Sequence, residues 1–76
     1  MKEHLSHRQI GERITMLRNI KGLSQEELAR SIKMSRPSLT QIELGNRQVS
    51  FIELQKIAHA LHFTLDDFVS DNFFEK

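Results

Sequence analysis

The sequence of 76 residues contains no cysteine. This absence excludes disulfide bonds, thiolate catalysis and zinc sites built from cysteine, and it is compatible with a reducing cytoplasm. The sequence also lacks any apolar stretch near the roughly 18 residues that a membrane-spanning helix needs. Its start, MKEHLSHRQ, has no apolar segment of the kind found in signal peptides. We therefore expect a soluble, cytoplasmic protein with no membrane partner.

Motifs for catalysis and cofactor binding are lacking as well. There is no glycine-rich phosphate loop and no nucleophile elbow, and a chain of this length has little room for a deep pocket. His4 with His7, and His59 with His62, have an i, i+3 spacing that can place two imidazoles beside a metal ion. No cysteine and no HExxH-type carboxylate accompanies them. We expect no enzyme, no metal site and no cofactor.

The formal net charge of +1 conceals an uneven distribution. Residues 1–63 hold ten Lys and Arg against six Glu, whereas residues 64–76 hold one Lys against four acids. The body of the chain is therefore mildly basic and the C-terminal segment acidic. A mildly basic body permits nucleic-acid binding without requiring it, because helical surfaces are often this charged.

One local pattern recurs five times along the chain. It is a Ser or Thr with an apolar residue just before it and another four positions after it, which is typical of a helix N-terminus. The copies are LSHRQI, LSQEEL, MSRPSL, VSFIEL and FTLDDF, starting at positions 5, 23, 34, 49 and 63. Gln9, Glu27, Glu53 and Asp67 complete or approximate a capping box in four copies, and the third copy has Ser38. Five helix starts predict an all-α fold, formed as one domain over residues 1–76.

Apolar spacing and flanking glycines indicate where these helices run. They predict helices over about residues 7–21, 25–32, 36–45 and 51–62, and a last helix that begins at residue 65. Only three residues separate the second helix from the third, so the two should cross steeply. This is helix-turn-helix geometry, over residues 25–44.

The third helix has an outward side with no packing role. A helical wheel turns Leu39, Ile42 and Glu43 inward. Pro37, Thr40, Gln41 and Leu44 then point outward, and Arg36 projects from the first turn; this side is too polar for a core. Such a side suits a DNA major groove, where Gln pairs with adenine, Arg with guanine, and apolar groups contact the thymine methyl. The alternative is an ordinary solvated helix surface with a proline start.

The combined motifs resemble one known family. Leu17-Arg18, the segments at 23–29, 34–36 and 42–45, and residues 54–67 are similar to the Cro and phage-repressor (XRE) type of helix-turn-helix proteins, over roughly residues 10–69. The resemblance implies a five-helix, lambda-repressor-like domain that binds double-stranded DNA with its third helix.

The resemblance also implies roles for individual residues. Base reading falls to Arg36, Pro37, Thr40 and Gln41, and phosphate contacts to Gln25, Ser35, Asn46 and Arg47. Ser35 is in addition a helix cap, and Asn46 and Arg47 are equally compatible with plain turn residues. Arg18 and Glu43 match a largely buried salt bridge that ties the third helix to the first.

The sequence departs from the family pattern at two turns. Lys33 occupies a turn position where glycine is usual, which predicts a left-handed backbone that strains a residue with a Cβ atom. His62 likewise replaces a glycine that is common after the fourth helix. Neither change removes a side chain expected to read DNA.

Three of the five aromatic residues, Phe68, Phe73 and Phe74, lie near the C-terminus, the last two within the tail 70–76. They predict a homodimer contact, or alternatively a tail that folds back on the core. The sequence thus favours a transcriptional regulator, expected to be a dimeric repressor. The alternatives are a protein-interaction module on the same fold, an antitoxin with a toxin partner, and a restriction-modification controller.

Overall fold

The computed structural model describes residues 6–69, with the side chains of residues 6–67. Its helices are α1 (His7–Ile20), α2 (Gln25–Ser31), α3 (Arg36–Leu44), α4 (Phe51–Leu61) and α5 (Leu65–Val69). Residues 6–69 contain no strand, so the predicted all-α fold with five helices is confirmed. In the same range, no helix combines the length and apolar character that crossing a membrane requires.

The helices begin where the repeated pattern predicts. Ser6, Ser24 and Ser50 form complete capping boxes with the residue three positions on in α1, α2 and α4. At α5, the Thr64 backbone N–H donates to Asp67 Oδ2 at 2.8 Å, and the Asp67 N–H donates to Thr64 Oγ1 at 3.2 Å. Since each box satisfies two backbone donors that a helix start leaves free, these short segments hold defined N-termini.

The predicted helix ends lie one residue too far along the chain. The helices end at Ile20, Ser31, Leu44 and Leu61, and the following residue in each case is the C-cap. The difference arises because a cap residue still bonds to the last turn while its backbone leaves the helix. Gly45 and His62, both caps, have φ angles of 83° and 62°, and Lys33 has 59°. The left-handed backbone predicted at Lys33 is confirmed.

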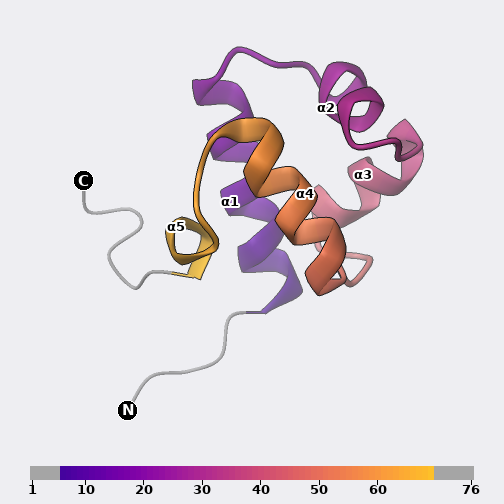
Figure 1. Cartoon of the computed structure of the whole chain (residues 1–76). Coiled ribbons are helices and arrows are strands. Elements are labelled where there is room, and N and C mark those ends of the chain that lie inside the picture. Colours follow the sequence, from indigo (N-terminus) through magenta and orange to yellow (C-terminus); the bar gives the residue numbers. More distant parts are fainter. Residues whose placement is uncertain (1–5, 70–76) are drawn as a thin grey trace.

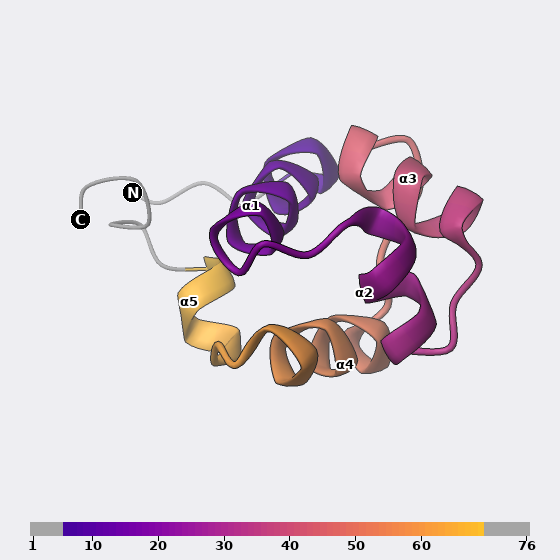
Figure 2. The ribbon, with the colours of Figure 1, turned by 90° about the horizontal axis from the view of Figure 1, so that it is seen from above.

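The helices enclose a single apolar core (Figure 1). Its buried residues are Ile14, Leu17, Leu28, Ala29, Ile32, Leu39, Ile42, Ile57, Ala58 and Leu61. Seen from above, α1 and α4 form two opposite sides, α2 and α3 lie together at one end, and α5 lies at the other (Figure 2). The most extensive contact between two helices joins α1 and α3. The position of α3 is therefore set chiefly by α1.

Candidate nucleic-acid interface

The third helix has one buried side and one free side. Leu39 and Ile42 are 0% and 1% exposed, and they anchor α3 in the core. On the opposite side Arg36, Pro37 and Gln41 are exposed to solvent. The structure thus brings three of the four predicted base readers together on one accessible surface.

The N-terminus of α3 is held by its own cap. Ser35 Oγ accepts a hydrogen bond from the Ser38 backbone N–H at 3.3 Å and donates to Ser38 Oγ at 3.0 Å. Pro37, in the first turn, has no N–H to leave unsatisfied. Because Ser35 is exposed, its capping role leaves the hydroxyl within reach of solvent, and its phosphate contact stays a prediction.

Arg18 of α1 and Glu43 of α3 form an ion pair away from solvent. Arg18 Nε lies 2.8 Å from Glu43 Oε2, and the two side chains are 12% and 4% exposed. Arg18 Nη2 donates to Glu43 Oε1 at 3.1 Å, and Arg18 Nη1 donates to the Leu23 carbonyl at 2.8 Å. Thr15 Oγ1 also donates to Glu43 Oε1, at 3.0 Å. One guanidinium therefore ties α3 and the loop before α2 to α1.

The carboxyl group of Glu43 remains ionised despite its burial. Burial by itself raises the pKa of Glu43, but hydrogen bonds from Arg18, Gln25 and Thr15 outweigh it and leave the pKa below its ordinary value. An ionised carboxylate only accepts hydrogen bonds, so every neighbour of Glu43 must present a donor to it.

Gln25 and Thr40 form hydrogen bonds within the protein. Gln25 Nε2 donates to Glu43 Oε1 at 2.9 Å, and Thr40 Oγ1 donates to Gln25 Oε1 at 2.8 Å. Both residues are half-buried. The side chain of Gln25, a residue predicted to contact phosphate, thus lies between two residues of α3, and the hydroxyl of Thr40, a predicted base reader, is bonded within the protein. Both predicted roles stay predictions. No sequence signal identified this contact, because the residues lie 15 and 18 positions apart.

Asn46 contacts Gln41, a residue predicted to read bases. Its Nδ2 donates to Gln41 Oε1 at 3.1 Å, and both side chains are exposed. A carbonyl oxygen has two lone pairs, so Gln41 retains one acceptor position and both N–H donors. The contact holds the Gln41 side chain beside the C-terminal end of α3.

Arg47 lies against the start of α4. Arg47 Nη2 is 2.8 Å from Glu53 Oε2, Nη1 is 3.0 Å from Oε1, and Nη1 also donates to the Gln48 carbonyl at 3.2 Å. The bidentate contact with Arg47, followed by the bond from the Ser50 N–H, lowers the pKa of Glu53 to about 2. The phosphate contact predicted for Arg47 would have to share this guanidinium with Glu53.

Gly11 of α1 helps to position α3, although it is not itself one of the residues predicted to contact DNA. The sequence analysis assigned it no role. A Cβ atom at this position would lie 2.6 Å from the Glu43 carbonyl oxygen in α3. The absence of a side chain lets α1 and α3 approach with their backbones nearly in contact. A glycine inside an amphipathic helix is the signal that could have identified this approach.

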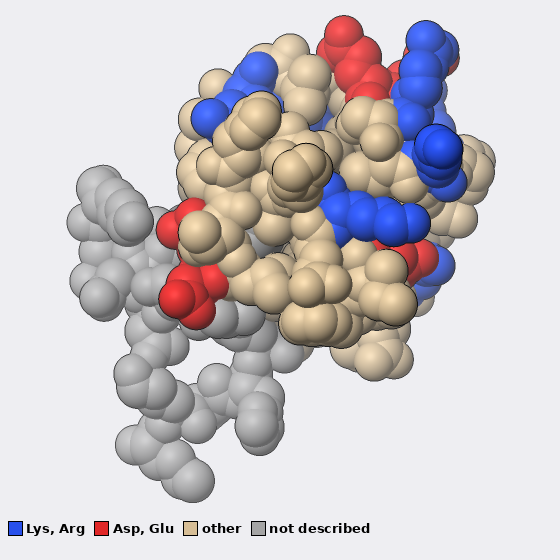
Figure 3. Space-filling view, in the orientation of Figure 1, with Lys and Arg blue, Asp and Glu red and all other residues tan. Residues whose placement is uncertain are grey.

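Charge is unevenly spread over the molecular surface. In Figure 3 most Lys and Arg side chains gather over the part where α2, α3 and α4 lie in Figure 1, and acidic side chains at the left edge lie over α5. Asp66 and Asp67 are the acids of α5. On the face that Figure 3 shows, the acids of α5 therefore lie apart from the basic side chains over α2, α3 and α4, although α2 and α4 carry acidic side chains as well.

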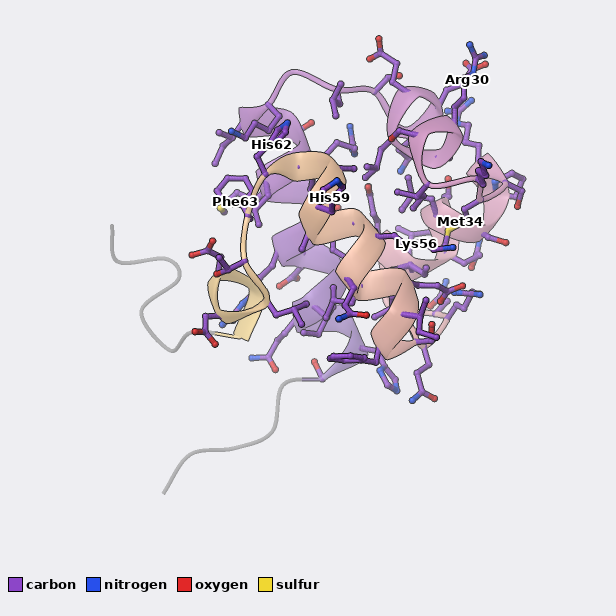
Figure 4. The ribbon with its side chains drawn as sticks, in the orientation of Figure 1. Arg30, Met34, Lys56, His59, His62 and Phe63 are labelled. Carbon is purple, nitrogen blue, oxygen red and sulfur yellow. The ribbon has the colours of Figure 1, made fainter. Side chains whose placement is uncertain are left out.

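A shallow groove runs between the C-terminal end of α2 and α4. Its lining includes apolar Ile32 and Ile52 together with Lys33, Lys56 and His59, and no acidic residue. Figure 4 shows Lys56, His59 and His62 following one another towards the C-terminal end of α4. Among residues 6–69, no three potential metal ligands gather at one place. The groove adds positive charge beside the turn that leads into α3.

The residues predicted to form the dimer contact cannot be placed. Phe73 and Phe74, with the tail 70–76, lie outside the described residues, and so does the side chain of Phe68. The predicted tail contact stays a prediction.

Comparison with known proteins gives consistent matches. Residues 14–68 match the sequence family described as Helix-turn-helix. Control protein C.MunI of a Mycoplasma species is 40% identical over 62 residues, which cover 80% of this chain and 84% of that protein. The restriction-modification controller protein C.AhdI from Aeromonas hydrophila is 35% identical with a TM-score of 0.79, over 82% of this chain and 94% of that chain. The clp gene regulator ClgR from C. glutamicum is 30% identical with a TM-score of 0.81, over 88% and 86%.

Proposed function

The chain belongs to the XRE-type helix-turn-helix family of DNA-binding transcriptional regulators, and we propose that it binds duplex DNA sequence-specifically through α3. The observation that carries this proposal is the exposed side of α3, with Arg36, Pro37 and Gln41, on a helix fixed from behind by Leu39 and Ile42. A major groove admits one α-helix, and the N-terminal part of a recognition helix meets the base edges.

Four residues of α3 have a chemical role in base reading. Arg36 forms a bidentate contact with guanine O6 and N7, and Gln41 does the same with adenine N6 and N7. Pro37 and the methyl group of Thr40 contact thymine methyl groups. The Arg18 and Glu43 pair holds α3 so that these side chains keep a fixed position during binding.

Phosphate contacts come from the N-terminal ends of α2 and α3 and from the loop that follows α3. The Gln25 backbone N–H, the Ser35 hydroxyl and the side chains of Asn46 and Arg47 flank the reading surface and approach the DNA backbone. Such contacts fix the register of a protein on DNA but carry no sequence information. The bidentate contact with Glu53 orients Arg47 before DNA arrives, which lowers the entropy lost on binding.

The functional unit is a homodimer. One recognition helix covers few base pairs, so two copies on a palindrome with half-sites about 34 Å apart give the specificity that a regulator needs. The contact between copies is the one predicted from the sequence for Phe68, Phe73 and Phe74, whose side chains lie outside the described residues. The acidic residues of α5 suit an end of the molecule that stays away from DNA.

The regulator is of the restriction-modification controller type. C.MunI is named a control protein and C.AhdI a restriction-modification controller protein, and this chain spans most of both. These names favour a controller over an antitoxin with a toxin partner. The mode of action expected from the sequence is that of a dimeric repressor.

Selection of bound sequences from random duplexes, followed by a salt titration, tests this proposal. The selected duplex should bind much more tightly than a scrambled duplex of the same composition. The logarithm of the association constant should fall linearly with the logarithm of salt concentration, because each neutralised phosphate releases counterions. Equal affinity for the selected and scrambled duplexes would contradict sequence-specific reading. No binding even at low salt would favour a protein-interaction module on the same fold.

A further inference from the structure

A continuous chain of hydrogen bonds runs from α1 to the reading surface of α3. Arg18 donates twice to Glu43, Gln25 donates to Glu43, and Thr40 donates to Gln25, with donor–acceptor distances of 2.8 to 3.1 Å. Every bond in this chain points towards Glu43. Its direction follows from the chemistry of the groups rather than from chance.

The donor-to-acceptor direction of these hydrogen bonds is fixed by the buried Arg18–Glu43 pair. A guanidinium can only donate, so both Glu43 oxygens accept from Arg18, and the ionised carboxylate has no proton of its own to offer. The end of the Gln25 side chain that faces Glu43 must therefore be the NH2 group. Its carbonyl oxygen is then turned towards Thr40, where a carbonyl can only accept. The single hydroxyl proton of Thr40 is consequently used inside the protein.

From this polarity, and on the basis of the proposed DNA-reading function, we propose that Gln25 is a positioning residue that limits which bases Thr40 can contact. With its proton committed to Gln25, Thr40 meets the DNA with oxygen lone pairs and a methyl group. The lone pairs accept from adenine N6 or cytosine N4, and the methyl group packs on a thymine methyl. Guanine O6 and N7 need a donor, so Thr40 disfavours guanine at the base that it faces.

Removing the carbonyl of Gln25 should release this restriction. In Gln25→Met the side chain keeps a similar length but no longer accepts, so the Thr40 hydroxyl is free to rotate and to donate to guanine. Discrimination against guanine should fall by about two- to tenfold at one base pair, which corresponds to one hydrogen bond. The preference at the base pairs read by Arg36 and Gln41 should stay unchanged.

The experiment uses the full chain and its selected duplex. Base preferences of the wild type and of Thr40→Ala are first compared, and the base pair whose preference changes is the one that Thr40 faces. Duplexes carrying each of the four base pairs there are then bound to the wild type, Gln25→Met, Thr40→Val and the double variant. Thr40→Val keeps the methyl group and removes the hydroxyl, so adding Gln25→Met to it should change the preference no further. Thermal unfolding of each variant verifies that it is folded.

The outcomes separate this inference from the proposed function. A loss of guanine discrimination at one position, absent in the Thr40→Val background, supports it. Uniform weakening on all duplexes by Gln25→Met would assign Gln25 to phosphate binding and overturn it, and so would an unchanged preference. If Gln25→Met unfolds, Gln25→Ala in the wild-type and Thr40→Val backgrounds replaces it, with the same outcomes. A wild type that binds no duplex specifically would overturn the proposed function itself.

Discussion

Gly11 of α1 lies against the backbone of Glu43 in α3, so closely that a methyl group on its Cα would come within 2.6 Å of the Glu43 carbonyl oxygen. The close approach matters because Glu43 belongs to α3, the helix proposed to read DNA. The absence of a side chain at Gly11 thus permits the short distance between α1 and α3. The Arg18–Glu43 ion pair joins the same two helices.

Gly11→Ala should destabilise the protein by about 1–3 kcal/mol, because the new methyl group can be accommodated only by moving one helix backbone. Urea unfolding measures the change in the free energy of unfolding. Asn19→Ala, on the exposed surface of the same helix, is the matched control and should change stability by less than about 0.5 kcal/mol. Equal stability of Gly11→Ala and the wild type would show that α1 and α3 are farther apart in solution.

Lys33→Gly should stabilise the fold by up to about 1 kcal/mol. The φ angle of 59° strains a residue with a Cβ atom, and this relief exceeds the entropy that glycine adds to the unfolded chain. The melting temperature gives the measurement. Lys33→Ala keeps the Cβ atom and removes the charge, so it should remain near the wild type. A lower melting temperature for Lys33→Gly alone would mean that position 33 is not left-handed.

The fold should lose stability as the pH falls from about 4.5 towards 2. The pKa of Glu53 is lowered from 4.5 to about 2 in the folded protein, so its ionised form stabilises the fold fully above pH 4.5 and progressively less below it. The lowered pKa of Glu43 acts in the same direction. Glu53→Gln and Arg47→Met should both flatten this dependence, measured by urea unfolding at a series of pH values. The same slope in the wild type and in both variants would contradict the assignment.

Arg18→Met should cost about 3–5 kcal/mol, because it leaves the buried Glu43 carboxylate without its cationic partner. The double variant Arg18→Met with Glu43→Met should recover most of this loss, since no buried charge remains and the half-buried Gln25 and Thr15 can turn to water. The unfolding free energies of the wild type, Arg18→Met, Glu43→Met and the double variant form a double-mutant cycle. Additive losses would indicate that the two groups do not interact.

Arg36→Ala and Gln41→Ala should each weaken binding to the selected duplex by about 1–3 kcal/mol and relax the preference at one base pair. Arg47→Ala should instead weaken binding to the selected and the scrambled duplex by the same factor, because a phosphate contact does not depend on base sequence. Fluorescence anisotropy with both duplexes separates the two classes. Equal losses on both duplexes for all three variants would remove Arg36 and Gln41 from the set of base readers.

The local features of this fold were determined by the sequence alone. Cap residues and capping boxes depend on interactions over three or four positions, which the order of residues specifies directly. The left-handed turn at Lys33 was expected from the family resemblance, in which glycine is usual at that position. The inward side of α3 was also predictable, since apolar residues at helical spacing must share one face. The helix-turn-helix arrangement followed from the short link between two such helices.

The partners of the polar side chains were decided only by the tertiary structure. Gln25 contacts Thr40 and Glu43 because the start of α2 packs beside these two residues of α3. A shift of α2 along α3 by a few ångströms would break these hydrogen bonds of 2.8 and 2.9 Å. Arg47 meets Glu53 in the same way through the path of a loop. Hydrogen bonding is directional and short-ranged, whereas apolar burial tolerates small displacements. The sequence therefore predicted which surface is proposed to face the DNA, and the packing of α1, α2 and α3 determined which polar atoms on that surface are already bonded within the protein.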